Sequence, residues 1–220
     1  MRYQNRIEAA QRLLPLLKKY SDAPDTVVLA IPRGALQIGA VLARELHLPL
    51  DIVVTKKIPA PGNEEYAIGA IAPDGEILLN EEMVRMYALP EGYLKGVAGK
   101  LMTDIERRYH TYRAKRSSGE PVNSGLDSMY PDLAGKTVIL TDDGIATGFT
   151  MKAAIEYLYR QKVKKIIVAV PVSSPDSAEE IKKIADEFVC PYLPAVFSAV
   201  AQFYDEFPQV SDEEAAQYLN

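Results

Sequence analysis

The sequence predicts an α/β protein built on a doubly wound, mostly parallel sheet. Apolar segments of strand length alternate with segments of helix length near both ends of the chain. The strand-length segments are continuously apolar, which is typical of strands covered by helices on both faces. A strand, a helix and a second strand follow one another directly, so we expect a right-handed parallel unit at the start of the sheet.

The first elements of this pattern are indicated by two kinds of local signal. Apolar residues at helical spacing favour helices, and runs of β-branched and other apolar residues favour strands. On these grounds we expect a helix over residues 6–20, a strand over 26–31, a helix over 35–46 and a strand over 51–55.

The alternation stops after the second strand. Residues 67–79 predict a β-hairpin turned by Asp74-Gly75. Charged helices are expected over residues 81–87 and 91–115, and a polar loop over 117–132.

We expect residues 58–132 to form an insertion, a lid or hood, within one domain spanning residues 1–220, because the core of such a segment is too thin to be stable alone. The segment from Pro59 to Tyr66 is rich in turn-forming residues and poor in apolar ones. It is a candidate for a loop that closes over a substrate.

After the insertion the parallel pattern resumes. The predicted elements are a strand over 137–141, a helix over 149–161, a strand over 165–170, a helix over 176–186 and short apolar pieces at 187–190 and 195–200.

Composition restricts the classes of partner. The formal net charge of −5 argues against a nucleic-acid-binding surface, which is typically basic. The single cysteine, Cys190, excludes an internal disulfide and a cysteine-based metal cluster. The sequence shows no apolar signal core and no apolar stretch of membrane-spanning length. We therefore expect a cytoplasmic protein with neither a nucleic acid nor a membrane as partner.

Residues 138–150 carry the strongest functional signal. An apolar strand ends in Asp142 and Asp143, and a small-residue loop then leads into a helix. A strand, a tight loop and a helix N-terminus together form an anion site, because backbone N–H groups converge there with the positive end of the helix dipole. Thr147 and Thr150 add hydroxyl donors. The acids cannot bind phosphate, so they must face hydroxyls or a metal on the same ligand. A ligand with a phosphate at one end and a diol at the other is a ribose 5-phosphate.

The acid pair has two other interpretations. Two acids at a strand end can be a helix cap beside a solvated carboxylate, or the acid pocket of a receiver-like phosphorylation domain. The loop over residues 144–150 disfavours both of these interpretations, because neither requires a glycine-rich loop with hydroxyl side chains.

The stretch 138–150 resembles the phosphoribosyl pyrophosphate (PRPP) motif of the type I phosphoribosyltransferases. The shared features are an apolar strand, two consecutive acids, two mostly apolar positions, and small and hydroxyl residues around a glycine. The departure is Phe149, where many members carry a small residue. From Ile31 to the tail at 211–214, the layout also resembles a group of bacterial and archaeal phosphoribosyltransferase-like proteins whose acceptor is unsettled.

The resemblance implies roles for the residues of the motif. Asp142 and Asp143 would hold the ribose 2- and 3-hydroxyls, directly or through water bound to Mg²⁺, the implied cofactor. The metal itself would be held mainly by PRPP oxygens, as this oxygen-seeking cation prefers. The implied PRPP-binding residues of the loop are Gly144, Ile145, Ala146, Thr147, Gly148 and Thr150.

Two further basic segments resemble parts of the family's diphosphate site. Arg33 and Gly34 resemble its pyrophosphate loop, with Arg33 in a catalytic role, although an Arg-Gly pair after a strand can also be an ordinary turn. Lys56 and Lys57 resemble basic residues that follow the second strand, and only one of them needs to reach the diphosphate. The alternative is a solvated pair. The arginines at 107, 108 and 113 could point into the site or form a charged helix face.

The resemblance also implies an acceptor base that packs against an aromatic ring under a C-terminal hood. Phe203 and Tyr204 are the candidates for base binding, with Phe197 and Phe207 nearby, although such rings also serve as core residues. The implied reaction is phosphoribosyl transfer from Mg-PRPP to a nitrogen acceptor, a nucleobase with purines slightly favoured. The alternative is a PRPP or nucleotide sensor that regulates a partner. A homo-oligomer is expected by analogy with the family.

Overall fold

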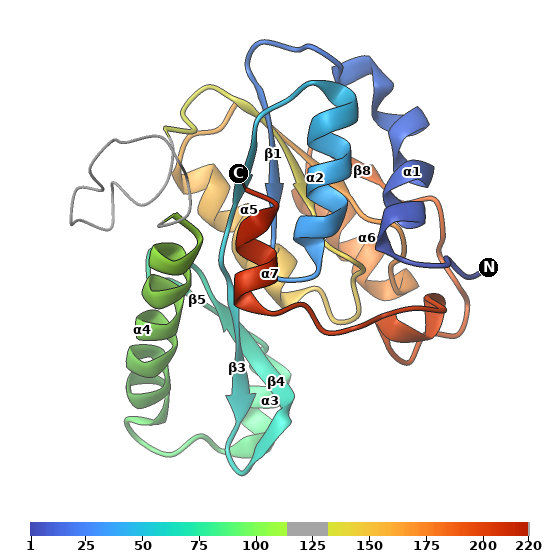
Figure 1. Ribbon diagram of the computed structural model, residues 1–220. Helices are drawn as coiled ribbons and strands as arrows, with labels where there is room; N and C mark the ends of the chain where they lie inside the picture. Colours follow the sequence, from blue (N-terminus) through green and yellow to red (C-terminus); the bar gives the residue numbers. More distant parts are fainter. Residues whose placement is uncertain (114–131, 220) are drawn as a thin grey trace.

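A five-stranded parallel sheet forms the centre of the protein, seen in a computed structural model that describes residues 1–113 and 132–219 (Figure 1). The strand order is β2-β1-β6-β7-β8, so the chain winds outward from β1 to β2 and then outward again from β6 to β8. The strands are β1 (Thr26–Ala30), β2 (Leu50–Ile52), β6 (Thr137–Thr141), β7 (Lys165–Ala169) and β8 (Glu187–Val189). The predicted doubly wound α/β fold is confirmed.

Helices cover both faces of this sheet (Figure 1). Because successive residues of a strand point to opposite faces, Val28 packs with α1 and α2, whereas its neighbour Leu29 packs with α5 and α6. The four helices are α1 (Arg6–Leu17), α2 (Ala35–Leu46), α5 (Phe149–Arg160) and α6 (Pro175–Ile184). Within the described part of the chain, no helix is both long and apolar enough to cross a membrane.

Local boundaries differ from expectation in three places. The predicted first helix ends at Leu17, and a 3-10 turn, η1 (Lys18–Tyr20), follows. The second strand ends at Ile52, three residues early. The helix predicted over 176–186 ends at Ile184, and a 3-10 turn, η3 (Val200–Phe203), begins at the last residue of the apolar piece at 195–200.

The insertion contains a second, antiparallel sheet with the order β3-β4-β5. Its elements are β3 (Lys56–Ala60), β4 (Asn63–Ile71), β5 (Ile77–Leu79), α3 (Glu81–Tyr87) and α4 (Tyr93–Arg113). The hairpin predicted around Asp74-Gly75 is present as β4 and β5. The polar loop predicted over 117–132 lies almost entirely outside the described residues.

The segment from Pro59 to Tyr66 is not the loop that its composition predicts. It forms the end of β3, a tight turn and the start of β4. Pro59 is tolerated because the register between the strands shifts on either side of it, where a missing N–H donor costs little. The buried side chains of Ile58 and Ile68 anchor this hairpin to the core.

The insertion shares a hydrophobic cluster with the parallel sheet. Tyr109 and Tyr112 of α4 are buried beside Ile52 of β2, and the Tyr109 hydroxyl donates to the Ile52 carbonyl at 3.1 Å. A final helix, α7 (Asp212–Gln217), which was not expected, packs against α4 and buries Ala215 and Ala216 in the same cluster. In Figure 1 the elements from β3 to α4 project from the edge of the core sheet at which β1 ends.

The N-terminal segment meets the segment that follows η3 at the same edge of the sheet. Backbone hydrogen bonds join Tyr3 to Phe203 at 2.8 Å and Asp205 to Tyr3 at 2.9 Å. The hydroxyl of Tyr3 donates to the carbonyl of Pro171, just after β7. The C-terminal segment is thereby held next to the carboxyl ends of β6 and β7, where ligands bind in open parallel sheets.

Candidate active site

The loop between β6 and α5 contributes most of one cavity of about 160 Å³. Gly148 caps α5 with a φ of 74°, a conformation that favours glycine, and no side chain caps the first turn of the helix. The N-terminal amides of α5 are therefore a ready anion site. The cavity is lined by Lys57, Asp142, Asp143, Gly144, Ile145, Ala146, Thr147, Gly148, Thr150, Met151 and Val200.

Hydrogen bonds from neighbouring segments fix the backbone of this loop. The carbonyl of Ala146 accepts from the hydroxyls of Ser174 and Ser177, each at 2.7 Å. The amide of Ile145 donates to the carbonyl of Val172 at 2.9 Å. The expectation that the Ile145 amide binds phosphate therefore does not agree with the structure, because this donor is already used. The candidate phosphate donors begin at Ala146.

The two acids of the motif have different surroundings. A carboxylate oxygen of Asp142 accepts from the amide of Asp143 at 2.8 Å. Oδ2 of Asp143 accepts from Nε and Nη2 of Arg6 at 3.1 and 3.0 Å. Burial, and then the charge of Asp143, raise the pKa of Asp142 well above its usual range. Burial also raises the pKa of Asp143, but the guanidinium of Arg6 opposes that rise.

Arg6 is a site residue that the sequence analysis missed. It is the first residue of α1 and is 4% exposed. Its remaining contacts are with the carbonyl of Pro208 at 2.9 Å and with the ring of Phe207, whose centroid lies 3.8 Å from the guanidinium carbon. Nothing in the local sequence marks it, because its partner Asp143 lies 137 positions away.

The turn after β1 contacts the acid pair through Gly34. An added β-carbon at Gly34 would lie 2.4 Å from Oδ2 of Asp143 and 2.8 Å from the guanidinium of Arg6. The peptide bond between Pro32 and Arg33 is cis. Arg33 is not among the residues that line the 160 Å³ cavity. Its positive charge instead acts on Asp212 and helps to lower the pKa of that carboxyl.

The side chains of the two lysines after β2 have different surroundings. Lys57 lines the cavity, whereas Lys56 forms an ion pair with Asp104 on α4. Burial alone would raise the pKa of Asp104, but its contacts with Lys56 and Arg107 outweigh that effect and lower the pKa to about 2. Lys57 is therefore the member of the pair that is placed to reach a ligand.

The arginines of α4 form a charged face of the helix. Arg107 pairs with Asp104 and, at 3.3 Å, with Asp212 of α7, and Arg108 lies near the same two acids. The side chain of Arg113 is outside the described residues. For Arg107, whose side chain is 55% exposed, the structure supports the helix-face interpretation, whereas the side chain of Arg108 is 13% exposed and its Nε is buried.

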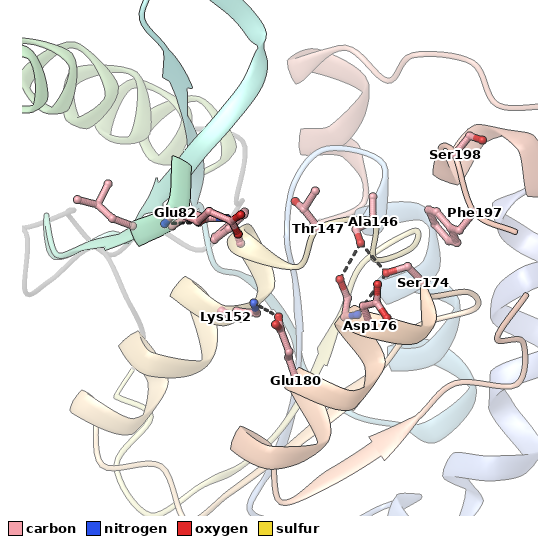
Figure 2. Close-up of a pocket in the computed structure, with 13 residues that line it drawn as sticks. Glu82, Ala146, Thr147, Lys152, Ser174, Asp176, Glu180, Phe197 and Ser198 are labelled. Carbon is pink, nitrogen blue, oxygen red and sulfur yellow. Dashed lines mark hydrogen bonds and ion pairs between the residues drawn. The ribbon is translucent and has the colours of Figure 1, made fainter. Parts of the chain in front are cut away.

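A second cavity of about 670 Å³ adjoins the first and shares Ala146 and Thr147 with it (Figure 2). Phe149 lines this second cavity and not the 160 Å³ cavity, so the departure from the family motif lies outside the smaller cavity. Lys152 forms an ion pair with Glu180 at its floor. The remaining lining residues are Leu79, Asn80, Glu82, Ser174, Asp176, Ser177, Phe197 and Ser198.

Phe203 and Tyr204, the candidates for base binding, are buried, with 5% and 2% of their surfaces exposed. They pack in a cluster with Tyr3, and the Tyr204 hydroxyl donates to the Asp143 carbonyl at 2.6 Å. Neither ring lines either cavity, so the structure places both in the core. Phe197, whose ring lies 5.0 Å from that of Phe203, is half-buried and lines the larger cavity.

A family model described as a phosphoribosyl transferase domain matches residues 4–207. The chain belongs to this family. It is 34% identical over 218 residues to MT0597 and to Rv0571c, proteins from two strains of Mycobacterium tuberculosis that are provisionally named phosphoribosyl transferases. These matches cover 99% of this chain but 46% of each relative, so the chain spans about half the length of the curated relatives it matches.

The fold of the whole chain also matches a solved structure. The crystal structure of TT1426 from Thermus thermophilus has a TM-score of 0.77 and 33% sequence identity, with coverage of 100% of this chain and 98% of that chain. The core sheet, the insertion and the C-terminal segment therefore belong to one shared architecture.

Proposed function

We propose that the protein transfers the 5-phosphoribosyl group of Mg-PRPP to a nitrogen acceptor and releases pyrophosphate. The observation that carries this proposal is the lining of the 160 Å³ cavity. An uncapped helix N-terminus, two carboxylates and the cation of Lys57 face one space, as a ligand with a phosphate, a diol and a diphosphate requires.

Each part of PRPP has a partner in this arrangement. The 5-phosphate binds the amides from Ala146 to Gly148 and the hydroxyls of Thr147 and Thr150. The ribose hydroxyls bind the carboxylates of the acid pair. The diphosphate lies by the turn at Gly34, where Lys57 offers a positive charge.

The acid pair fits a magnesium ion that takes most of its ligands from the substrate. Among residues 1–113 and 132–219, no group of three or more His, Cys, Asp or Glu side chains could hold a metal. Two carboxylates, Asp142 and Asp143, are suitable for Mg²⁺, which keeps water and substrate oxygens as its other ligands. When bound, the ion supplies positive charge that offsets the charge of the diphosphate.

The reaction breaks the bond between the anomeric carbon and the diphosphate oxygen and forms a bond from that carbon to the acceptor nitrogen. Positive charge develops on the sugar and negative charge on the leaving group. The carboxylates of Asp142 and Asp143 stabilise the positive charge on the sugar, and the ammonium of Lys57 stabilises the negative charge on the leaving diphosphate. Catalysis therefore depends on positioned charges rather than on a protein nucleophile.

The acceptor binds in the adjoining 670 Å³ cavity. This space reaches the phosphate loop at Ala146 and Thr147, and the half-buried ring of Phe197 offers a surface for stacking. Glu82 and Asp176 provide acceptors for N–H groups (Figure 2). These features support a nucleobase rich in N–H donors, with purines slightly favoured over smaller rings.

Two measurements test the proposal. Calorimetry with Mg²⁺ and PRPP tests binding, and a screen for pyrophosphate release over purines, pyrimidines and related bases tests turnover. We expect binding, and release with at least one base. Binding without release against every acceptor would instead identify a sensor of PRPP.

The matched variants are the double substitution Asp142→Asn with Asp143→Asn and, as a control, Asp25→Asn at an exposed position far from the cavity. We expect the double variant to lose turnover by a factor of at least about 100, since it removes both placed charges. The control should keep the rate of the unmodified protein. Retained turnover in the double variant would refute the assignment.

A further inference from the structure

Arg6 places a positive charge in the interior of the protein at the back of the acid pair. The side chains of Arg6 and Asp143 are 5% and 18% exposed, and 3.0 Å separates Nη2 from Oδ2. A buried guanidinium is costly unless it is paired and its donors are used. Here Nε and Nη2 bind Asp143, Nη1 binds the Pro208 carbonyl, and the ring of Phe207 covers one face.

Both contacts of the guanidinium fall on the same oxygen of Asp143. The ion pair therefore sets the direction of the carboxylate and leaves its other oxygen, Oδ1, outside the pair. The backbone of Asp143 is also held, because the hydroxyl of Tyr204 donates to its carbonyl at 2.6 Å. Within the described part of the chain Asp142 has no ion pair with an arginine, although the charges of Lys57 and Arg6 oppose the rise of its pKa, and its hydrogen bond is with the next amide in the chain.

The turn at Gly34 packs directly against the ion pair of Arg6 and Asp143. A β-carbon at Gly34 would overlap both Oδ2 of Asp143 and the guanidinium of Arg6. The first helix, the turn after β1, the motif after β6 and the C-terminal segment thus meet at one ion pair. A shift of the carboxylate would move the sugar-binding oxygens and the diphosphate turn together.

We propose that Arg6 is a positioning residue for PRPP: it orients the carboxylate of Asp143 so that Oδ1 receives a ribose hydroxyl. This inference rests on the proposed function and deepens it. It gives the two acids different tasks. Asp142 meets the sugar on its own, whereas Asp143 acts as a unit with Arg6, a residue that lies outside the PRPP motif.

A purely structural ion pair makes a different prediction. Loss of such a pair would lower the melting temperature but would leave the affinity of the folded protein for PRPP unchanged. If Arg6 instead acts through Asp143, the effects of changing the two residues on affinity are not additive, because either change removes the same interaction.

The experiment measures the dissociation constant of Mg-PRPP by calorimetry, below the melting temperature of each variant. The variants are Arg6→Gln, Arg6→Lys, Asp143→Asn and the double substitution of Arg6→Gln with Asp143→Asn. Arg12→Gln is the matched control, because Arg12 lies on the same helix in an exposed pair with Glu8.

We expect Arg6→Gln to weaken PRPP binding at least 10-fold, about one unit on a logarithmic affinity scale. The double variant should bind no more weakly than Asp143→Asn alone. Arg6→Lys should recover part of the loss, since it keeps the charge but not the planar fork. Arg12→Gln should bind as the unmodified protein does.

Unchanged affinity in folded Arg6→Gln, or additive losses in the double variant, would overturn the inference. If Arg6→Gln does not fold, Arg6→Lys decides alone, and an affinity equal to that of the unmodified protein counts against the inference. Failure of the unmodified protein to bind PRPP is a separate result. It would overturn the proposed function, and this inference with it, before any variant is made.

Discussion

Gly34 and Asp143 come so close that a β-carbon on the glycine would lie 2.4 Å from a carboxylate oxygen of the acid. The two residues belong to different strand ends, after β1 and after β6, and these strands are neighbours in the sheet. The carboxyl ends of adjacent parallel strands lie at one edge, so the turn at Gly34 and the acid pair form a single surface.

The first prediction concerns Gly34→Ala. The backbone at Gly34 has φ −57° and ψ −36°, values that alanine adopts freely, so the only cost is the overlap with Asp143 and Arg6. We expect PRPP affinity to fall by a factor of about 10 or more because the carboxylate must move. The control is Gly96→Ala on α4, where nothing lies within 4 Å of the added carbon. Equal affinities in both variants would contradict the contact.

The second prediction separates Lys56 from Lys57. Lys57→Ala should weaken PRPP binding by a factor of about 10 to 100, since a hydrogen bond to a charged group contributes about 1.5–3 kcal/mol. Lys56→Ala removes the partly buried pair with Asp104 and should lower the free energy of unfolding, because the carboxylate loses a partner, while leaving PRPP affinity unchanged. Calorimetric titration of both variants with Mg-PRPP is the measurement. A larger loss of affinity in Lys56→Ala would reverse the assignment.

The third prediction concerns Gly148, which caps α5 with a φ of 74°. Gly148→Ala should destabilise the protein by about 1–2 kcal/mol, because alanine is strained in the left-handed region. Its nearest neighbours would be 3.5 Å away, so backbone strain rather than a clash is responsible. Gly148→Asn should cost less, since asparagine tolerates this conformation better. Urea unfolding of both variants tests this order of stability, and an equal loss would speak against backbone strain.

The fourth prediction concerns pH and Glu187 of β8, which lines neither of the two cavities. Its carboxylate contacts Lys19 at 2.7 Å, the Tyr20 hydroxyl at 2.6 Å and Lys165 at 3.1 Å. Burial alone would raise its pKa, but these partners outweigh burial and lower the pKa from 4.5 to about 2. A pKa that is lower in the folded state gives stability that is present above pH 4.5 and is lost as the pH falls toward 2.

Glu187→Gln should therefore lower the free energy of unfolding at pH 6 by on the order of 1 kcal/mol, given solvent screening of a partly exposed group. The difference from the unmodified protein should shrink as the pH falls from about 5 to about 2. Urea unfolding across this range is the measurement. Glu45→Gln, which removes an exposed pair with the adjacent Arg44, is the control. A difference that does not vary with pH would rule out linkage to Glu187.

The elements that were predicted correctly are those whose sequence pattern lies within one short stretch of the chain. Residues 138–150 contain the strand, the acids, the loop and the helix start in one continuous stretch, so neighbours in the sequence are neighbours in the site. The β4–β5 hairpin was likewise found from its own turn at Asp74-Gly75. The segment Pro59 to Tyr66 was misjudged because its strands depend on pairing with each other and on packing against α4, which composition does not reveal.

The order of residues along the chain was enough to predict the parallel α/β architecture and to locate the loop that lines the 160 Å³ cavity, because both follow from patterns repeated or completed within a few residues. Which charged side chains serve that loop was settled by the packing of the folded chain. Folding brought Arg6 to Asp143 across 137 positions, turned Lys57 rather than Lys56 to the cavity, and buried Phe203 and Tyr204. Burial and ion pairing depend on distant segments coming together, and no local pattern contains that information.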